Sequence, residues 1–167
     1  MLRPRIIPCL LIHKGGLVKT QGFGSPKYVG DPINAVKIFN EKESDELMVL
    51  DIDTTVNGVE PNYSLIAKLA QECRMPLCYG GGIKTVEQAS RIIQMGVEKV
   101  SISSAAISNP SFLNEIAETV GRQSVVAVLD VRKQKGFFPR GYEITTHNGL
   151  KPYNYDLLDT VLRFQEE

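Results

Sequence analysis

The sequence feature that most constrains the fold is a run of three glycines between two apolar segments. Gly80-Gly81-Gly82 follows a short apolar stretch at residues 76–79, and an amphipathic helical pattern then leads to a strand-like segment at residues 99–104. Consecutive glycines cost conformational entropy, so they are typical of backbone that turns tightly or lets another group approach its N–H groups. This order predicts a βαβ unit over residues 76–104.

Polar residues in both loops of this unit indicate an anion-binding site. Thr85 is the expected N-cap of the helix, and Gln88 is expected to complete a reciprocal capping box. Ser103 and Ser104 end the second strand, at the same end of the sheet as the glycine turn. Backbone N–H groups and hydroxyls there could hold a phosphate without a lysine. The alternative, that the glycines only form a tight turn, stays open at this point.

The composition favours a small-molecule ligand. Of 167 residues, 43% are hydrophobic, and 19 basic side chains balance 19 acidic ones. A chain of this length can bury a core as one domain, residues 1–167. Zero formal charge gives no field that would recruit nucleic acid or an anionic membrane. The apolar run near the N-terminus is too short to span a membrane, so we expect no membrane segment.

Cysteine and histidine usage is typical of a cytoplasmic protein. Cys9, Cys73 and Cys78 show no CxxC spacing and fall inside expected strands or helices, so we expect reduced, buried thiols. His13 and His147 are the two histidines, too few for a histidine-rich metal site. The sequence therefore predicts no metal and no cofactor.

The first thirty residues are expected to contain one strand and one long loop. Residues 6–12 form a continuous apolar run, which is typical of a strand covered on both faces. Residues 13–30 are rich in Gly, Lys, Thr, Gln and Ser and are expected to be a loop of functional or mobile type. Lys19 is its candidate ligand-facing charge, although a solvated lysine is the more common case.

The middle of the chain predicts further βα units. Asp31-Pro32 is expected to cap a helix that ends near Ser44. Residues 46–52 are the expected second strand, with Asp51 and Asp53 at its exit. Carboxylates in that position lie where parallel α/β sheets bind ligands, unless they only cap loops. The helix that follows carries Leu65, Ile66, Leu69, Ala70 and Cys73.

The last third of the chain changes character after a fifth strand. Asn109-Pro110 is expected to cap a helix, and residues 124–130 are the expected fifth strand, which ends at an aspartate. Residues 135–138 and 142–149 predict a small antiparallel excursion, because alternation and turn residues replace the apolar runs. A final helix is expected to begin near Asn154.

Strand and helix therefore alternate five times, which predicts an α/β fold of the (β/α)8 TIM-barrel type with about five βα units present. We expect a partial barrel whose remaining units are absent or supplied by something else. Its first and fifth strands are the expected unpaired edges.

Segments spread along the whole chain carry a family resemblance. They are residues 5–10, Lys19 and residues 30–32, 45–47, 50–52, 80–83, 99–102, 105–106 and 109–110. In this order and spacing they resemble the HisF family, the cyclase subunits of imidazole glycerol phosphate synthase. The resemblance stops before the end of a typical family barrel.

The resemblance implies a lyase that works in histidine biosynthesis. A family member docks a HisH-type glutaminase, receives ammonia through the barrel and uses it on a bisphosphorylated ribulose aminoimidazole precursor. The products are imidazole glycerol phosphate and an aminoimidazole carboxamide ribotide. By resemblance, Gly82, Ser103 and Ser104 match the first phosphate site, with Ser103 where the family commonly has Asn. Asp130 matches one of two catalytic aspartates.

Other matched positions lie at the two ends of the barrel. Lys19 and Asp51 match residues that line the active-site mouth. Arg5, Glu46 and Lys99 fall at the starts of strands one, two and four, where the family has a charged ring that gates ammonia. Without the resemblance, charges at strand starts would be interpreted as solvated.

Leu11 is the main departure from the family pattern. The family's other catalytic aspartate occupies this position, so one of two carboxylates is absent. General acid–base chemistry that needs two groups in different protonation states then loses one partner. Two alternatives follow: a paralogue that passes ammonia to another acceptor, as in sugar amidination for surface polysaccharides, or a noncatalytic scaffold.

Overall fold

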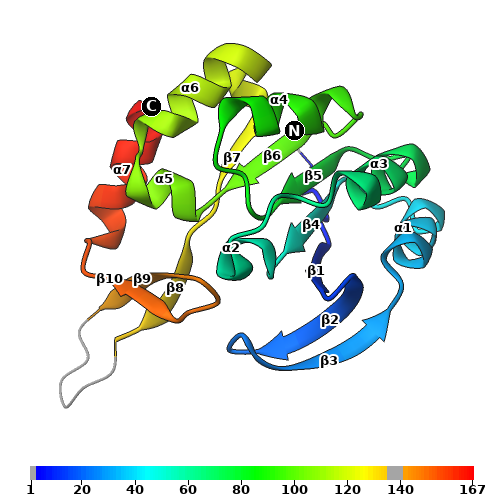
Figure 1. Cartoon of the computed structure of the whole chain (residues 1–167), viewed down its shortest axis with the longest axis horizontal. Helices are drawn as coiled ribbons and strands as arrows, with labels where there is room; N and C mark the ends of the chain where they lie inside the picture. Colours follow the sequence, from blue (N-terminus) through cyan, green and yellow to red (C-terminus); the bar gives the residue numbers. More distant parts are fainter. Residues whose placement is uncertain (1–2, 135–140) are drawn as a thin grey trace.

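A computed structural model describes residues 3–134 and 141–167 of the chain. Within them, seven strands form one sheet in the order β3-β2-β1-β4-β5-β6-β7 (Figure 1). Five neighbouring strands of this sheet are parallel to one another, and this parallel pairing confirms the α/β fold class. They are β1 (Cys9–His13), β4 (Leu47–Asp51), β5 (Leu77–Gly80), β6 (Lys99–Ile102) and β7 (Val125–Ala127).

Helices connect these strands and pack along one side of the sheet (Figure 1). The longer ones are α1 (Pro32–Glu41), α3 (Tyr63–Glu72), α4 (Val86–Gln94) and α6 (Ser111–Val120). Short helices α2 (Thr54–Asn57) and α5 (Ser104–Ser108) follow β4 and β6, and a 3-10 turn at Arg122–Ser124 precedes β7. The core between the layers includes Val49, Ile66, Ile92, Val100 and Ile116. Burial of this layer fixes where the strand ends lie.

The expected N-caps of α1 and α4 are confirmed. The Asp31 carboxylate accepts from the Asn34 N–H, and the Thr85 hydroxyl accepts from the Gln88 N–H. The Gln88 side chain reaches back to the N–H of Lys84 at 2.8 Å rather than to that of Thr85. The expected capping box therefore forms with its return bond displaced by one residue.

The expected cap at Asn109 is wrong. Pro110 already has helical backbone angles, φ −58° and ψ −38°, so it takes the N-cap position of α6 and leaves Asn109 one residue outside. The Asn109 side chain instead accepts a hydrogen bond from the Ser111 hydroxyl. The helix ends at Gly121, whose φ of 93° is readily adopted only by glycine.

The loop expected over residues 13–30 is also wrong. This segment forms an antiparallel hairpin, β2 (Gly16–Gln21) and β3 (Gly24–Gly30), which extends the sheet beyond β1. The first parallel strand therefore has partners on both sides, and the edge expected there is occupied. In the described part of the chain, β3 and β7 are the outermost strands of this sheet.

The two turns of the hairpin explain why the chain reverses there. Lys14 and Gly15 connect β1 to β2, and Gly22 and Phe23 connect β2 to β3. All four residues have positive φ, as two-residue type I′ turns require. Glycine at one position of each turn keeps the steric cost low.

The expected fifth strand divides into two. β7 ends at Ala127, and Asp130 begins a strand of a separate antiparallel sheet. The antiparallel excursion is confirmed for its described part, while residues 135–138 lie outside the described residues. The second sheet consists of β8 (Asp130–Lys133), β9 (Tyr142–Thr146) and β10 (Lys151–Tyr153), and helix α7 (Leu157–Glu166) follows it.

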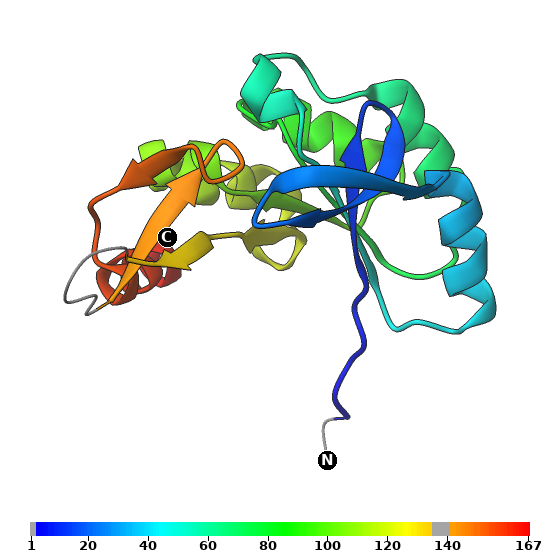
Figure 2. The same cartoon turned by 90° about the horizontal axis from the view of Figure 1, so that it is seen from below.

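The parallel sheet is curved and its described strands do not close into a barrel. Its face opposite the helices carries Cys9 and Leu11, which alternate along β1 with the core-packed Leu10 and Ile12. Cys9 is exposed because no helix covers that face, so its expected burial is wrong, whereas Cys78 is buried as expected. In Figure 2 the N-terminal segment leaves the sheet at the end opposite to the β2–β3 hairpin.

The described part of the chain contains no helix with the length and apolar character needed to cross a membrane.

Candidate functional site

A cavity of about 640 Å³ lies at the carboxyl ends of the parallel strands. Most of the residues that the sequence assigned to substrate line it: Asp51, Gly82, Ser103, Ser104 and Asp130. Leu11 lines the same cavity. This is the end of a parallel sheet at which α/β proteins and TIM barrels place their active sites.

Lys19 is the one substrate candidate that the structure places elsewhere. It lies exposed on β2 and is not among the described residues that line the cavity. Its neighbour Thr20 and the turn residue Phe23 line the cavity instead. The hairpin therefore contributes a hydroxyl and an aromatic ring to the site.

The glycine turn after β5 lies against the loop after β4. Gly81 and Gly82 have φ values of 122° and 72°, which side chains rarely allow. A Cβ atom on Gly82 would lie 2.7 Å from the Cβ of Thr54. The Gly82 N–H points to the Thr55 hydroxyl at the long distance of 3.4 Å. The turn needs glycine because the Asp51 carbonyl and the Thr54 side chain leave no room for a Cβ atom.

The loop after β6 presents hydroxyl groups to the cavity. Ser103 precedes α5, but its side chain makes no capping hydrogen bond to the helix. Ser101, Ser103 and Ser104 all line the cavity, on the strand end next to the glycine turn. Two neighbouring strand ends therefore offer backbone N–H groups and hydroxyls to the same space.

Burial raises the pKa of both cavity carboxyls. For Asp130, desolvation is the cause of the raised pKa. For Asp51, desolvation is the largest cause, and hydrogen bonds from the N–H groups of Asp53 and Thr54 partly offset it. Asp51 is thereby fixed against the loop that leads into α2, and Asp130 shares the cavity lining with the apolar Leu11.

At the amino ends of the strands, the three expected gate residues form one ion-pair cluster. Lys99 Nζ lies 2.7 Å from Glu46 Oε1, and Arg5 lies 3.4 Å from Glu46 Oε2. Glu46 is 4% exposed. Cys78 lies close by, and burial raises the pKa of its thiol to about 12. The structure thus brings together three charges that are distant in the sequence and removes Glu46 from solvent.

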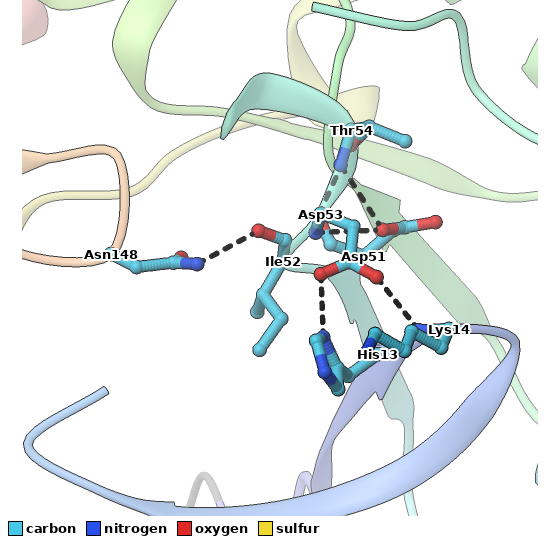
Figure 3. A network of polar contacts seen from close by, with 7 residues as sticks. All are labelled: His13, Lys14, Asp51, Ile52, Asp53, Thr54 and Asn148. Carbon is cyan, nitrogen blue, oxygen red and sulfur yellow. Dashed lines mark hydrogen bonds and ion pairs between the residues drawn. The ribbon is translucent and has the colours of Figure 1, made fainter. Parts of the chain in front are cut away.

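A second polar network lies beside the main cavity (Figure 3). His13 Nδ1 and Asp53 Oδ1 are 2.6 Å apart, and the Lys14 N–H donates to Asp53 Oδ2 at 2.7 Å. The Asn148 side chain donates to the carbonyl of Ile52 at 3.0 Å. Sequence reasoning missed the His13–Asp53 pair. Its signal was available, because His13 ends β1 and Asp53 lies two residues beyond the end of β4, the adjacent parallel strand.

Across residues 3–134 and 141–167, no group of three or more His, Cys, Asp or Glu side chains is placed to hold a metal ion. The polar side chains of the cavity are hydroxyls, the amide of Asn148, the carboxyls of Asp51 and Asp130, the Lys84 amine and the His147 ring. This set suits hydrogen bonding to an organic ligand.

Comparison with known proteins identifies the family. The model of the histidine biosynthesis protein family matches residues 5–167. The chain belongs to this family. Members of the histidine biosynthesis protein family are TIM barrels, and the curved parallel sheet with its helices agrees with several βα units of such a barrel, left open here.

Curated relatives within the family share more than half of their aligned residues with the chain. A Vibrio vulnificus protein designated "Putative imidazole glycerol phosphate synthase subunit hisF3" is 57% identical over 165 residues, which are 99% of this chain and 63% of the relative. A Leptospira borgpetersenii protein designated "Putative imidazole glycerol phosphate synthase subunit HisF" is 56% identical over 161 residues, 96% of this chain and 63% of the relative. The chain thus spans just under two thirds of the length of these relatives.

Replacing Lys99 with methionine tests the buried ion pair. Glu46 would keep only Arg5, whose side chain is 63% exposed, and a buried charge that loses its close partner is strongly destabilising. We expect the free energy of unfolding, measured in urea, to fall by about 3 kcal/mol. Arg5→Ala is the control, with an expected loss of about 0–1 kcal/mol because the Arg5 side chain is exposed and Glu46 keeps Lys99. Equal losses in the two variants would contradict this interpretation.

Replacing Asp130 with asparagine tests the burial of its carboxyl. Its folded-state pKa is raised, so its contribution to stability falls as pH rises from the unfolded-state pKa through the folded-state pKa. We expect Asp130→Asn to melt at a higher temperature than the natural protein at pH 7 and at nearly the same temperature at pH 3. Exposed Glu118→Gln should show no such pH-dependent difference. A lower melting temperature for Asp130→Asn than for the natural protein at pH 7 would contradict the raised pKa of the Asp130 carboxyl.

Proposed function

We propose that this chain supplies the first phosphate site and one catalytic carboxylate of a HisF-type imidazole glycerol phosphate synthase subunit. The subunit uses ammonia from a HisH-type glutaminase on a bisphosphorylated ribulose aminoimidazole precursor. It forms imidazole glycerol phosphate and an aminoimidazole carboxamide ribotide. The observation that carries the proposal is one cavity, lined by Gly82, Ser103, Ser104 and Asp130, in a chain 57% identical to a relative with that designation.

In this proposal the phosphate binds to the loops after β5 and β6. Their donors are backbone N–H groups next to Gly82 and the hydroxyls of Ser103 and Ser104. These groups suit a phosphate because they donate hydrogen bonds without a large side chain in between. Asp51 is the proposed residue of the active-site mouth and Asp130 the proposed proton acceptor or donor, and both line the cavity together with Leu11. Lys19 can reach this ligand only through a rearrangement of the hairpin, since it lies outside the cavity lining.

We also propose that residues 1–167 act as one partial barrel domain and that the protein works in the cytoplasm. The interleaved core of sheet and helices supports the first statement. The buried, unpaired Cys78 is compatible with the reducing conditions of the second.

Gly82→Val tests the phosphate site. A side chain at this position meets Thr54, so the turn must move and its N–H groups lose their position. We expect loss of ribose 5-phosphate binding in isothermal titration calorimetry. Gly58→Val is a matched control, because Gly58 has a similar φ of 67° but no atom within 4 Å of the added Cβ. Unchanged affinity in Gly82→Val would contradict the proposed site.

Leu11→Asp tests the missing carboxylate. Leu11 can neither accept nor donate a proton and lines the cavity with Asp130. General acid–base catalysis contributes roughly 10²–10⁴-fold in rate, so the Leu11 protein should have little ammonia-dependent cyclase activity and the variant should gain part of it. The assay follows product formation from the precursor with ammonium salt, in a chain extended to the length of the relatives. Robust activity with Leu11 would show that Asp130 suffices.

The amino ends of the strands are the proposed docking face for the glutaminase. The Arg5–Glu46–Lys99 cluster lies there, with Ile6 exposed beside it. A photocrosslinking residue at Ile6 should capture the HisH-type glutaminase of the same organism. Tyr28 on β3, which is similarly exposed, is the control position. Capture at Tyr28 and none at Ile6 would place the glutaminase at the wrong end of the sheet for this proposal.

A further inference from the structure

A smaller cavity of about 330 Å³ adjoins the main one. The two cavities share the wall residues Thr20, Phe23, Ile52 and Asn148. The two cavities therefore lie side by side, with these four residues between them. The proposed function assigns no role to this second space.

The smaller cavity is lined by His13 and Asp53, which form a hydrogen-bonded pair (Figure 3). Both oxygens of Asp53 are engaged, one by the His13 ring and the other by the Lys14 N–H. When the ring is neutral and Nδ1 carries its proton toward Asp53, Nε2 presents a lone pair. Within the described part of the chain, the His13 ring makes one hydrogen bond, to Asp53. In that neutral state the pair offers a hydrogen-bond acceptor to a ligand hydroxyl.

The rest of the lining suits an uncharged group with both apolar and polar faces. Phe23, Pro26 and Val56 provide apolar walls, and Asn57 and Asn148 provide amides. A sugar ring presents C–H groups on its faces and hydroxyls at its edge, which matches such a lining. The charges near His13 are those of Asp53, Lys14 and the cavity carboxylate Asp51, and the carboxylates disfavour a second phosphate there.

The sheet sets the distance between this cavity and the phosphate loops. β1, which ends at His13, lies two strands from β5 and three from β6. Neighbouring strands are 4.7–4.9 Å apart, so the separation is roughly 10 to 14 Å. A ligand that fills both places needs a phosphate at one end and a hydroxylated ring or chain of that length at the other.

We propose that the smaller cavity is a subsite for the polyhydroxylated, uncharged part of a sugar phosphate, with His13 Nε2 accepting a hydrogen bond from one of its hydroxyls. This proposal rests on the proposed function for the phosphate end. Asp53 is the positioning residue, because it fixes the tautomer and orientation of the His13 ring.

Calorimetry with three probes separates the two ends of the ligand. The probes are methyl phosphate, trehalose 6-phosphate and unphosphorylated trehalose, and the proteins are the natural chain, His13→Ala and Asp53→Asn. We expect trehalose 6-phosphate to bind the natural chain about tenfold more tightly than methyl phosphate, as one added hydrogen bond permits. Both variants should lose this advantage and keep their affinity for methyl phosphate. Lys27→Ala, exposed on β3 outside both cavities, should keep both affinities.

The same experiment distinguishes failure of the subsite from failure of the proposed function. The subsite is wrong if trehalose 6-phosphate binds the natural chain no more tightly than methyl phosphate does. It is also wrong if the tighter binding persists in both variants. If methyl phosphate does not bind, the phosphate site fails; His13-dependent binding of trehalose then still supports the subsite, and no such binding overturns it.

Histidine NMR on the unmutated protein avoids any effect of substitution on folding. The sequence has two histidines, so His13→Ala identifies the His13 ring signals and leaves those of His147. Trehalose 6-phosphate should shift the His13 signals, whereas methyl phosphate should not. Identical His13 signals in the presence and absence of trehalose 6-phosphate would overturn the subsite.

Discussion

The close contact between the glycine turn after β5 and the loop after β4 is the constraint on which the site depends. Gly81 and Gly82 occupy positions where a Cβ would meet Thr54 and the backbone near it, so the two loops touch through backbone and small atoms. This contact keeps the N–H groups of the turn at the cavity surface. It also fixes Asp51, whose carboxylate caps the same loop. The proposed phosphate site therefore depends on this packing, and Asp53, the partner of His13, belongs to the loop that takes part in it.

Much of the parallel sheet and of the cavity could be predicted because their signals are local. Apolar runs bounded by caps located β4, β5 and β6, and glycine and serine at consecutive strand ends located the cavity lining. Residues at the same end of parallel strands must lie near one another. The same rule, with the family resemblance, brought Arg5, Glu46 and Lys99 together at the opposite end, where the structure has the ion-pair cluster.

The features that could not be predicted depend on which strands pair. The β2–β3 hairpin gave no strand signal because β3 is largely exposed and lacks alternating burial. Residues 124–130 were predicted as one strand, although pairing with β6 stops at Ala127 and Asp130 pairs with β9. The position of Asp130 in the cavity lining thus follows from tertiary pairing. His13 was assigned to a loop for the same reason, so its bond to Asp53 was missed.

Two chemically different ends of one sheet are central to this account: a buried ion cluster at the amino ends, and hydrogen-bond donors around a cavity at the carboxyl ends. The most direct test is a titration of ¹⁵N-labelled protein with inorganic phosphate, followed through its backbone amide signals. The account expects the largest, saturable shifts at Gly81, Gly82, Ser103 and Ser104, with Lys99 at the other end unchanged. Saturable shifts confined to residues outside the loops after β5 and β6 would contradict it.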